Sequence, residues 1–277
     1  MIVGVNGAAL DRFMAASRED TRVVAAFLGG SHAAGTADEY SDLDLYLIVG
    51  DQNYDTFFAE RRAFLGHLGE AVFLEDFSDF GFDMVVFILS GGVEGELTLG
   101  RASGFDHIHG GPFEILVDKE GILEGRVFPL HGPSQVEQRR TLRWLIYWFW
   151  RDLSEFNRAM VRGRLWTAHG LLEGLRLKCV NVARLKHEFF SVGMAGYEGL
   201  EQAADAQDLE SLRATLCPLE REAMLEAAGR LVGFYLRTAP PLAIQQGIAY
   251  PADLEAVVID KLQRWCGLHL DARTTEC

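Results

Sequence analysis

The stretch GGSHAAGTADEYSDLDLYL, residues 29–47, decides the fold of this chain. An apolar run at 23–28 leads into it and another at 43–49 leads out, and both are short and rich in β-forming residues, which predicts two strands. Asp42 and Asp44 are separated by one residue, and alternate residues of a strand point to the same side. The stretch therefore predicts two carboxylates presented together at one end of a strand.

Two carboxylates that lie close together repel each other unless a cation lies between them. Oxygen ligands suit Mg²⁺, which is usually held by one or two carboxylates together with substrate phosphates. Gly30 and Ser31 offer backbone N–H groups and a hydroxyl a short distance away, and glycine lets a phosphate approach the backbone closely. The stretch therefore indicates a phosphate-binding turn beside a metal-binding pair of acids.

The first half of the chain has the pattern of a small α/β domain. Amphipathic spacing predicts helices at 7–20 and 55–69, and Ala33, Ala34 and Gly35 suit a short helix start after the phosphate turn. Further apolar runs, separated by turn residues, predict strands at 71–74, 82–89, 94–99 and 113–117.

Strand signals almost vanish after the prolines at 129 and 133. Helices are expected at 135–162, 165–190, 209–216, 219–236 and 252–268. Ser134 and Glu137 have the spacing of a capping box at the start of the first helix, and Pro240, Pro241 and Pro251 are expected to break helices. We therefore predict two domains, residues 1–132 with an α/β fold and residues 133–277 with an all-helical fold.

Composition narrows the class of protein. The 277 residues carry 26 basic and 40 acidic side chains, a net charge of −14 with no long basic run, which disfavours nucleic acid as the main partner and weakly favours a cationic substrate. The four cysteines have no C-x-x-C spacing and no apolar run approaches ~18 residues, so we expect reduced thiols in a cytoplasmic protein that does not cross a membrane. A homodimer is compatible with these features.

Gly30-Ser31, Gly35 and Ser41-Asp42-Leu43-Asp44 together resemble the signature of the DNA polymerase β-like nucleotidyltransferase superfamily. The layout of the whole chain resembles the two-domain lincosamide nucleotidyltransferases, relatives of the aminoglycoside nucleotidyltransferases. The resemblance is specific over 23–49, moderate over 82–100 and architectural after 133. It implies a polymerase β palm-like mixed sheet followed by a helical bundle.

The resemblance also implies an antibiotic-resistance activity: transfer of AMP from Mg-ATP to a hydroxyl of a small molecule. On this basis Asp42 and Asp44 hold the metal ions. Residues that bind the nucleotide are Gly30, Ser31, Gly35 and Ser41. The family's third acid is a glutamate in a Gly-Glu-hydrophobic segment, which Gly95-Glu96-Leu97 matches, and it serves as base or metal ligand. Close lincosamide enzymes carry Asp-x-Glu where this chain has Asp42-x-Asp44, so the acceptor stays open.

Three residues on the neighbouring predicted strands are candidates for the third acid: Asp83, Glu94 and Glu96. Transfer to a hydroxyl needs a positioned base and metal clamping, which any of these carboxylates could supply. Phe82-Asp83-Met84 has the hydrophobic-Asp-hydrophobic form common in the superfamily. We favour Glu96 because it matches the closer family segment, with Asp83 as the alternative.

Several other residues have two interpretations. His32 either contacts phosphate or is an exposed loop residue, and His107 with His109 lacks a third ligand that would favour a metal site. The aromatic residues Trp144, Tyr147, Trp148 and Trp150 are expected to be mostly core, with part of the stripe available to line a substrate cleft. Asp152 and Glu155 could bind an amine, although a solvated helix face is favoured.

Two other functions remain as alternatives. A protein-modifying nucleotidyltransferase of the toxin–antitoxin type would use the same site on a protein hydroxyl, but such proteins are commonly small single domains. A non-catalytic nucleotide-binding protein would be expected to lack one of the metal carboxylates, and both Asp42 and Asp44 are present.

Overall fold

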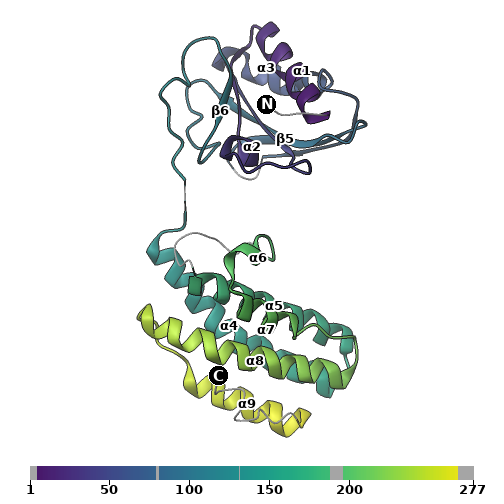
Figure 1. Cartoon of the computed structure of the whole chain (residues 1–277), viewed down its shortest axis with the longest axis vertical. Coiled ribbons are helices and arrows are strands. Elements are labelled where there is room, and N and C mark those ends of the chain that lie inside the picture. The colour runs from purple at the N-terminus through teal and green to yellow at the C-terminus, as the bar shows by residue number, and fades with distance from the viewer. Residues whose placement is uncertain (1–4, 79–80, 131, 188–195, 268–277) are drawn as a thin grey trace. The chain divides into compact units, whose positions relative to one another are not determined.

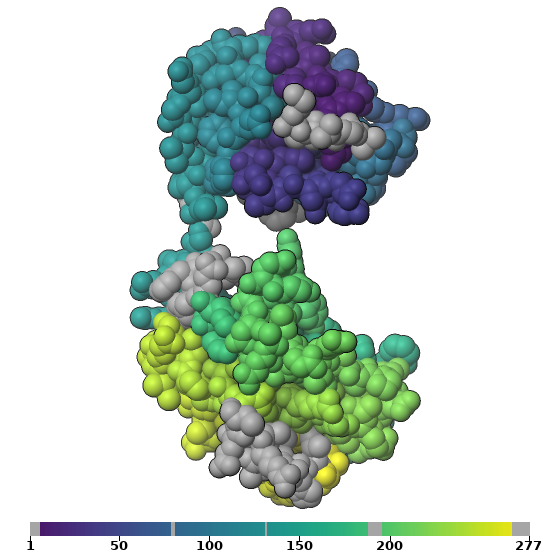
Figure 2. Space-filling model, viewed as in Figure 1, coloured from purple at the N-terminus to yellow at the C-terminus, as the bar shows by residue number. Residues whose placement is uncertain are grey.

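The structure is a computed structural model that describes residues 5–78, 81–130, 132–187 and 196–267. The chain divides into two compact units, Met1–His131 and Gly132–Cys277 (Figure 1). Figure 2 shows the surface of the described atoms in the same view. The predicted α/β plus α organisation is confirmed, since all described strands lie in the first unit and the second is helical.

A mixed sheet of six described strands forms the centre of the first unit, in the order β3-β4-β5-β2-β1-β6. The strands are β1 (Val23–Leu28), β2 (Leu43–Val49), β3 (Ala71–Phe77), β4 (Asp83–Leu89), β5 (Glu94–Arg101) and β6 (Glu114–Asp118). Only the central pair, β2 with β5, is parallel among these ladders, and the others are antiparallel. The two halves of the sheet are therefore joined along β2 and β5.

Helices α1 (Val5–Glu19) and α3 (Tyr54–Leu65) supply the core on one face of the sheet. Phe13 of α1 and Phe64 of α3 meet edge to face, with ring centroids 6.1 Å apart. Alternate residues of β2 point into this core, beginning with the fully buried Leu43 and Leu45. The intervening residues of β2 therefore point to the opposite face.

The opposite face is covered by a separate, smaller core. Phe105, Ile108 and Phe128, from the segment between β5 and the end of the unit, pack against Phe27 of β1 and Ile48 of β2. The short helices α2 (Gly30–Ala34) and η1 (Asp51–Asn53) lie at the ends of β1 and β2. This second face carries the polar residues of β2 beside its aromatic cover.

The second unit is built from helices around one apolar core. Its helices are α4 (Gln135–Val161), α5 (Leu165–His187), α6 (Leu200–Ala203), α7 (Ala206–Arg213), α8 (Arg221–Gln245) and α9 (Ala252–Cys266). Phe149 of α4 stacks on Tyr235 of α8 with 3.7 Å between ring centroids, and both side chains are fully buried. The predicted ends of two helices, at 190 and 268, lie outside the described residues, as does Cys277.

The predicted capping box at the start of α4 is confirmed. The Glu137 N–H donates to Ser134 Oγ at 3.3 Å, and the Ser134 N–H donates to the Glu137 carboxylate at 2.8 Å. These two bonds satisfy backbone donors that the first turn of a helix leaves without partners.

The prediction that Pro240 and Pro241 break a helix is wrong. Both lie inside α8, which continues to Gln245. A proline in a helix interior removes a hydrogen bond and costs about 3 kcal/mol. Here Ala239 and Ala243 on the same helix are fully buried, and the Thr238 hydroxyl bonds to the Phe234 carbonyl at 2.9 Å. Burial of this part of α8 outweighs the local preference.

Two findings bear on the chain's environment. No helix in the described parts of the chain is both long and apolar enough to cross a membrane. Each of the described cysteines, Cys179, Cys217 and Cys266, is a free thiol.

We predict that Ser134→Ala lowers the stability of the helical unit by about 1 kcal/mol, because the capping bond to the Glu137 N–H is lost. All five tryptophans of the chain lie in this unit, at positions 144, 148, 150, 166 and 265. Denaturant unfolding followed by tryptophan fluorescence therefore reports on it directly. Ser134→Asp is the control, since aspartate also caps, and a midpoint for Ser134→Ala equal to wild type would contradict the prediction.

Candidate active site

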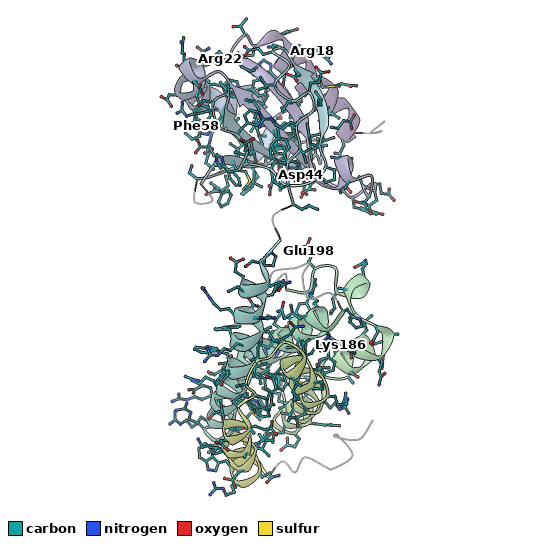
Figure 3. The ribbon with its side chains drawn as sticks, turned by 90° about the vertical axis from the view of Figure 1, so that its left-hand side faces the viewer. Arg18, Arg22, Asp44, Phe58, Lys186 and Glu198 are labelled. Carbon is teal, nitrogen blue, oxygen red and sulfur yellow. The ribbon has the colours of Figure 1, made fainter. Side chains whose placement is uncertain are left out.

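The parallel pairing of β2 and β5 brings Asp44 directly opposite Glu96. Residues paired in this way point to the same face of a sheet, and here it is the face away from α1 and α3. Asp42 lies one residue before β2 and is exposed, on the same side as Asp44 by alternation. Figure 3 shows Asp44 at the opposite end of the first unit from Arg18. The three predicted acids therefore share one face of the sheet.

The charges of these acids act on one another. Burial raises the pKa of Asp44, and the negative charge of Asp42 raises it further. Burial also raises the pKa of Glu96, with added contributions from Asp44 and Asp42. Among the described residues, no Lys, Arg or His forms an ion pair with any of the three. The site thus holds an excess of negative charge, which His32 and His109 offset only in part at Asp44.

The phosphate turn packs directly against Asp44. The Gly29 N–H donates to the Asp44 carbonyl at 2.9 Å, and Gly30 begins α2 with φ of +56°. A Cβ at Gly30 would lie 1.7 Å from Asp44 Oδ2, so no other residue fits there without displacing the carboxylate. The Ser31 hydroxyl oxygen is buried and has no hydrogen-bond partner in the described structure. This unpaired group is suited to a phosphate oxygen.

Two of the predicted nucleotide-binding residues shape the loop between the turn and β2. Gly35 caps the end of α2 in the left-handed conformation, with φ of +72°. The Ser41 hydroxyl accepts the Asp38 N–H at 2.9 Å and donates to the Asp38 carboxylate at 3.1 Å. Ser41 therefore orders the loop that carries Asp42 and would have to release Asp38 to contact a nucleotide.

The structure separates the candidates for the third acid. Asp83 of β4 faces the α1 and α3 side of the sheet, where its carboxylate accepts the Tyr54 hydroxyl at 2.7 Å and the Ser78 hydroxyl at 2.8 Å. Glu94 shares a face with Glu96 but is exposed and lies two residues earlier, at the start of β5. Of the three, Glu96 is the one that the strand register places beside Asp44.

Tyr46 is a residue of this face that the sequence analysis missed. It follows Asp44 by two residues, and its ring stacks on Phe27 with 4.4 Å between centroids and a 4° interplanar angle. The His109 ring meets the Tyr46 ring edge to face, with 4.8 Å between the ring centroids. Burial, with the charges of Asp44 and Glu96, raises the pKa of Tyr46 to about 12, so its hydroxyl stays protonated. The alternation 42, 44, 46 was the signal that could have revealed it.

The histidines of the first unit have different surroundings. His107 Nε2 bonds to the Gly81 carbonyl at 3.1 Å and His109 Nε2 to the Pro112 carbonyl at 3.0 Å, which gives no shared metal site. His32 is half-buried near Asp44, and its Nε2 is buried without a partner in the described structure. His32 is thus not a fully exposed loop residue.

The acids of α4 that could have bound an amine are already paired. Asp152 forms an ion pair with Lys178 at 2.7 Å, and Glu155 pairs with Arg151 at 2.6 Å and with Arg158. The favoured interpretation was a solvated helix face, but the Asp152 and Glu155 side chains are only 19% and 28% exposed, and ion pairs within the helical unit engage both carboxylates. In the aromatic stripe Trp150 is fully buried, whereas Trp144 and Trp148 are 40% and 44% exposed and stack with 5.9 Å between centroids.

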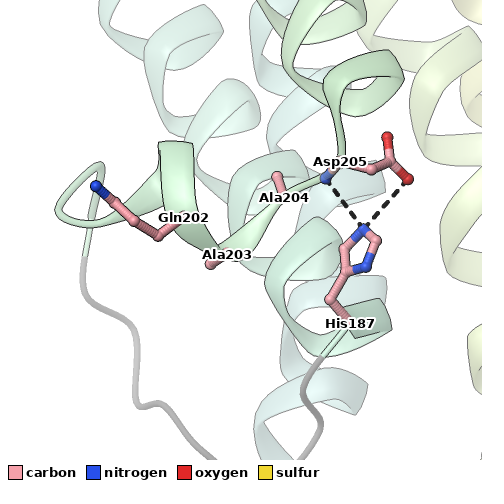
Figure 4. Close-up of a pocket in the computed structure, with 5 residues that line it drawn as sticks. All are labelled: His187, Gln202, Ala203, Ala204 and Asp205. Carbon is pink, nitrogen blue, oxygen red and sulfur yellow. Dashed lines mark hydrogen bonds and ion pairs between the residues drawn. The ribbon is translucent and has the colours of Figure 1, made fainter.

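A second group of potential ligands lies in the helical unit. Among the described residues, His187, Asp205 and Asp208 have ligand atoms within 4.8 Å of one another, a closer grouping than the acids of the sheet achieve. Two of them, His187 and Asp205, border a hollow of about 470 Å³ (Figure 4). However, Lys186 bonds both carboxylates, at 3.3 and 3.0 Å, and the Asp205 side chain caps α7. The ion pairs and the cap account for this group.

Two solved structures are similar to this chain in outline. An aminoglycoside 6-adenyltransferase from Bacillus subtilis is 14% identical, with 96% of this chain and 100% of that chain covered and a TM-score of 0.44. A nucleotidyltransferase-like protein from Exiguobacterium sibiricum 255-15 is 11% identical, with 93% and 80% covered and a TM-score of 0.35. No curated protein sequence matches the chain.

The match to a family model is more informative. The model described as streptomycin adenylyltransferase matches residues 6–264. This match covers both units, and it confirms the predicted resemblance to antibiotic nucleotidyltransferases. The chain therefore belongs to the streptomycin adenylyltransferase family and is an adenylyltransferase.

Proposed function

We propose that this adenylyltransferase uses Mg-ATP to transfer AMP to a hydroxyl group of a small, antibiotic-like acceptor. The observation that carries the proposal is the register of β2 and β5, which sets Asp44 opposite Glu96 while Gly30 of the phosphate turn packs against Asp44. Acidic ligands and a phosphate-binding turn are the two parts that nucleotidyl transfer requires.

The residues present fit a magnesium ion. Asp42, Asp44 and Glu96 offer only oxygen ligands, and they leave an excess of negative charge on one face of the sheet. When bound there, Mg²⁺ would screen the charge of the triphosphate and polarise the phosphoryl group that is transferred. The acids in turn would fix the ion at the end of β2.

We assign the triphosphate to Gly30 and Ser31. The absence of a side chain at Gly30 lets the backbone of the turn lie against Asp44, and the Ser31 hydroxyl, which has no partner in the described structure, can donate to a phosphate oxygen. Gly35 and Ser41 support this turn through the helix cap and the bonds to Asp38. The partnerless Nε2 of His32 makes that side chain a further candidate for phosphate contact.

Glu96 would act as the base. Burial and the charges of Asp44 and Asp42 raise the pKa of Glu96, which makes it a better proton acceptor than an ordinary carboxylate. As the acceptor oxygen forms its bond to the α-phosphorus of ATP, the bond from that phosphorus to the oxygen that bridges the α- and β-phosphates breaks. Pyrophosphate then leaves. The proton of the acceptor hydroxyl moves to Glu96, which balances the step.

The family description and the charge of the chain both support an aminoglycoside as acceptor. Aminoglycosides carry several hydroxyls and several cationic groups, and a net charge of −14 attracts cations. Lincosamides remain the second class to test because of the resemblance in layout. The free thiols of Cys179, Cys217 and Cys266 support a cytoplasmic location.

A mass-shift screen tests the function. The purified protein is incubated with Mg²⁺, each of the four nucleoside triphosphates and a panel of aminoglycosides and lincosamides. We expect one acceptor class to gain a single AMP with release of one pyrophosphate. Gain of a nucleotide by the protein itself, or by no acceptor in the panel, would contradict the proposal.

The phosphate turn gives a prediction about nucleotide affinity. Gly30→Ala should weaken binding of a non-hydrolysable ATP analogue, measured by calorimetry, because the new Cβ collides with Asp44 Oδ2. Gly35→Ala is the matched control, because Gly35 also has a positive φ but nothing lies within 4 Å of a Cβ added there. Equal losses in the two variants would mean that backbone strain, and not the approach to Asp44, is responsible.

A second prediction concerns Asp44 and stability. Its pKa in the folded protein is raised, so the folded state holds this proton more tightly than the unfolded chain. Ionised Asp44 therefore destabilises the metal-free fold, an effect that is absent below the unfolded pKa of about 4 and complete above the folded pKa. Asp44→Asn should be more stable than wild type at pH 7 without Mg²⁺, yet lose most turnover.

Thermal unfolding at pH 7, with and without Mg-ATP, measures this effect. Mg-ATP should stabilise wild type and leave Asp44→Asn nearly unchanged. The control is Glu94→Gln, which removes an exposed charge from the same face. An Asp44→Asn protein that is stabilised by Mg-ATP as much as wild type would exclude Asp44 as a ligand.

A third prediction identifies the base. Glu96→Gln keeps the shape of the side chain and loses the proton acceptor, so turnover should fall by ~10²–10⁴-fold with nucleotide binding nearly preserved. If Glu96 also binds the metal, Mg²⁺ affinity should fall too, and added Mg²⁺ should recover part of the rate. Steady-state kinetics at several Mg²⁺ concentrations separates these roles.

Two variants serve as controls for Glu96→Gln. Glu94→Gln alters the neighbouring exposed acid and should retain near wild-type turnover. Asp83→Asn disturbs the bonds to Tyr54 and Ser78, so it should affect stability more than turnover. Loss of turnover in Asp83→Asn with activity retained in Glu96→Gln would reverse the assignment of the third acid.

A further inference from the structure

Tyr46 has a fixed ring and a hydroxyl without a hydrogen-bond partner among the described residues. We propose that this hydroxyl binds the acceptor, donating a hydrogen bond to the acceptor's hydroxyl-bearing part beside Glu96. The inference rests on the proposed function, since it assigns a specificity-determining residue to the same site. Tyr46 would be a neutral binding group on the face of the sheet that carries Asp42, Asp44 and Glu96.

The position of Tyr46 follows from the strand. Along β2, Asp44 and Tyr46 point to the same face, and the parallel register sets them opposite Glu96 and Thr98 of β5. Thr98, the residue opposite Tyr46, is buried. Both Asp44 and Glu96 act electrostatically on the Tyr46 hydroxyl. The hydroxyl therefore lies in the neighbourhood of the proposed base.

The direction of the hydroxyl is set by packing. The ring of Tyr46 stacks on the fully buried Phe27, and His109 closes its edge. A Cβ at Gly29 would lie 2.8 Å from Tyr46 Cε2 and 2.9 Å from His109 Cε1, so the phosphate turn also presses against the ring. A side chain held on these sides places its polar end with little loss of conformational freedom when a ligand binds.

Two acids act on the Tyr46 hydroxyl, Asp44 and Glu96. Asp44 is proposed to hold the metal ion, so we infer the ligand of Tyr46 from Glu96. Glu96 takes a proton from the acceptor hydroxyl in the proposed step, so that hydroxyl must lie beside Glu96. A phenol is a neutral donor and acceptor, which suits a hydroxylated and amine-bearing acceptor. The triphosphate instead has the backbone of Gly30 and the hydroxyl of Ser31 as donors. Tyr46 is thus assigned to the acceptor and not to the nucleotide.

Tyr46→Phe tests the assignment with streptomycin as the acceptor and Mg-ATP as the donor. Loss of one hydrogen bond to bound acceptor should raise the KM for streptomycin roughly three- to tenfold, with the KM for ATP unchanged. The unfolding midpoint should match wild type, because no bond within the described protein is lost. A purely structural role for Tyr46 would not produce this split between the two substrates.

Tyr54→Phe is the matched control in the same unit. Its hydroxyl bonds to Asp83 on the other face of the sheet, so its removal should lower the unfolding midpoint and leave the KM for streptomycin unchanged. An unchanged KM for streptomycin in Tyr46→Phe overturns this inference alone, and a rise confined to the KM for ATP reassigns Tyr46 to the nucleotide. If wild type transfers AMP to another member of the panel and not to streptomycin, the KM for that acceptor is compared instead. Absence of transfer to every acceptor in the panel overturns the proposed function, and this inference with it.

Discussion

The parallel ladder between β2 and β5 is the constraint on which the candidate site depends. It sets Asp44 opposite Glu96. Burial raises the pKa of both carboxylates, and the charge of Asp44 raises that of Glu96 further. The opposite sides of the same strands bury Leu45 and Leu97 completely in the core beneath α1 and α3. Apolar burial on one face thus holds together charges that repel on the other.

Local patterns made much of the fold predictable. The predicted strands 23–28 and 43–49 coincide with β1 and β2, because a buried strand bounded by turn residues is a short-range signal. The capping box at Ser134 and Glu137 is equally local. The acids Asp42 and Asp44 could be placed on one face from their spacing alone. The choice of Glu96 came from family resemblance, and the register that sets it beside Asp44 is a long-range property that spacing does not contain.

What sequence could not supply depends on tertiary packing. Pro240 and Pro241 were expected to end a helix, but burial of α8 carries the helix through them. The Ser41 hydroxyl is bonded to Asp38 in a turn that only the folded loop forms, and its assignment to the nucleotide stays a prediction. Tyr46 was passed over as an ordinary strand residue, because nothing in its neighbours along the chain shows that Phe27 and His109 hold its ring.

The central ladder also bears on the order in which the first unit folds. Three antiparallel pairings join strands that follow one another along the chain: β1 with β2, β3 with β4, and β4 with β5. By contrast, β2 and β5 join Leu43–Val49 to Glu94–Arg101 across the whole intervening segment. Contacts between distant segments form late, because closing a long loop costs entropy before any contact repays it. The two acids would then meet only after the local antiparallel pairs have formed, and a partly folded chain would hold either half of the site without the pair.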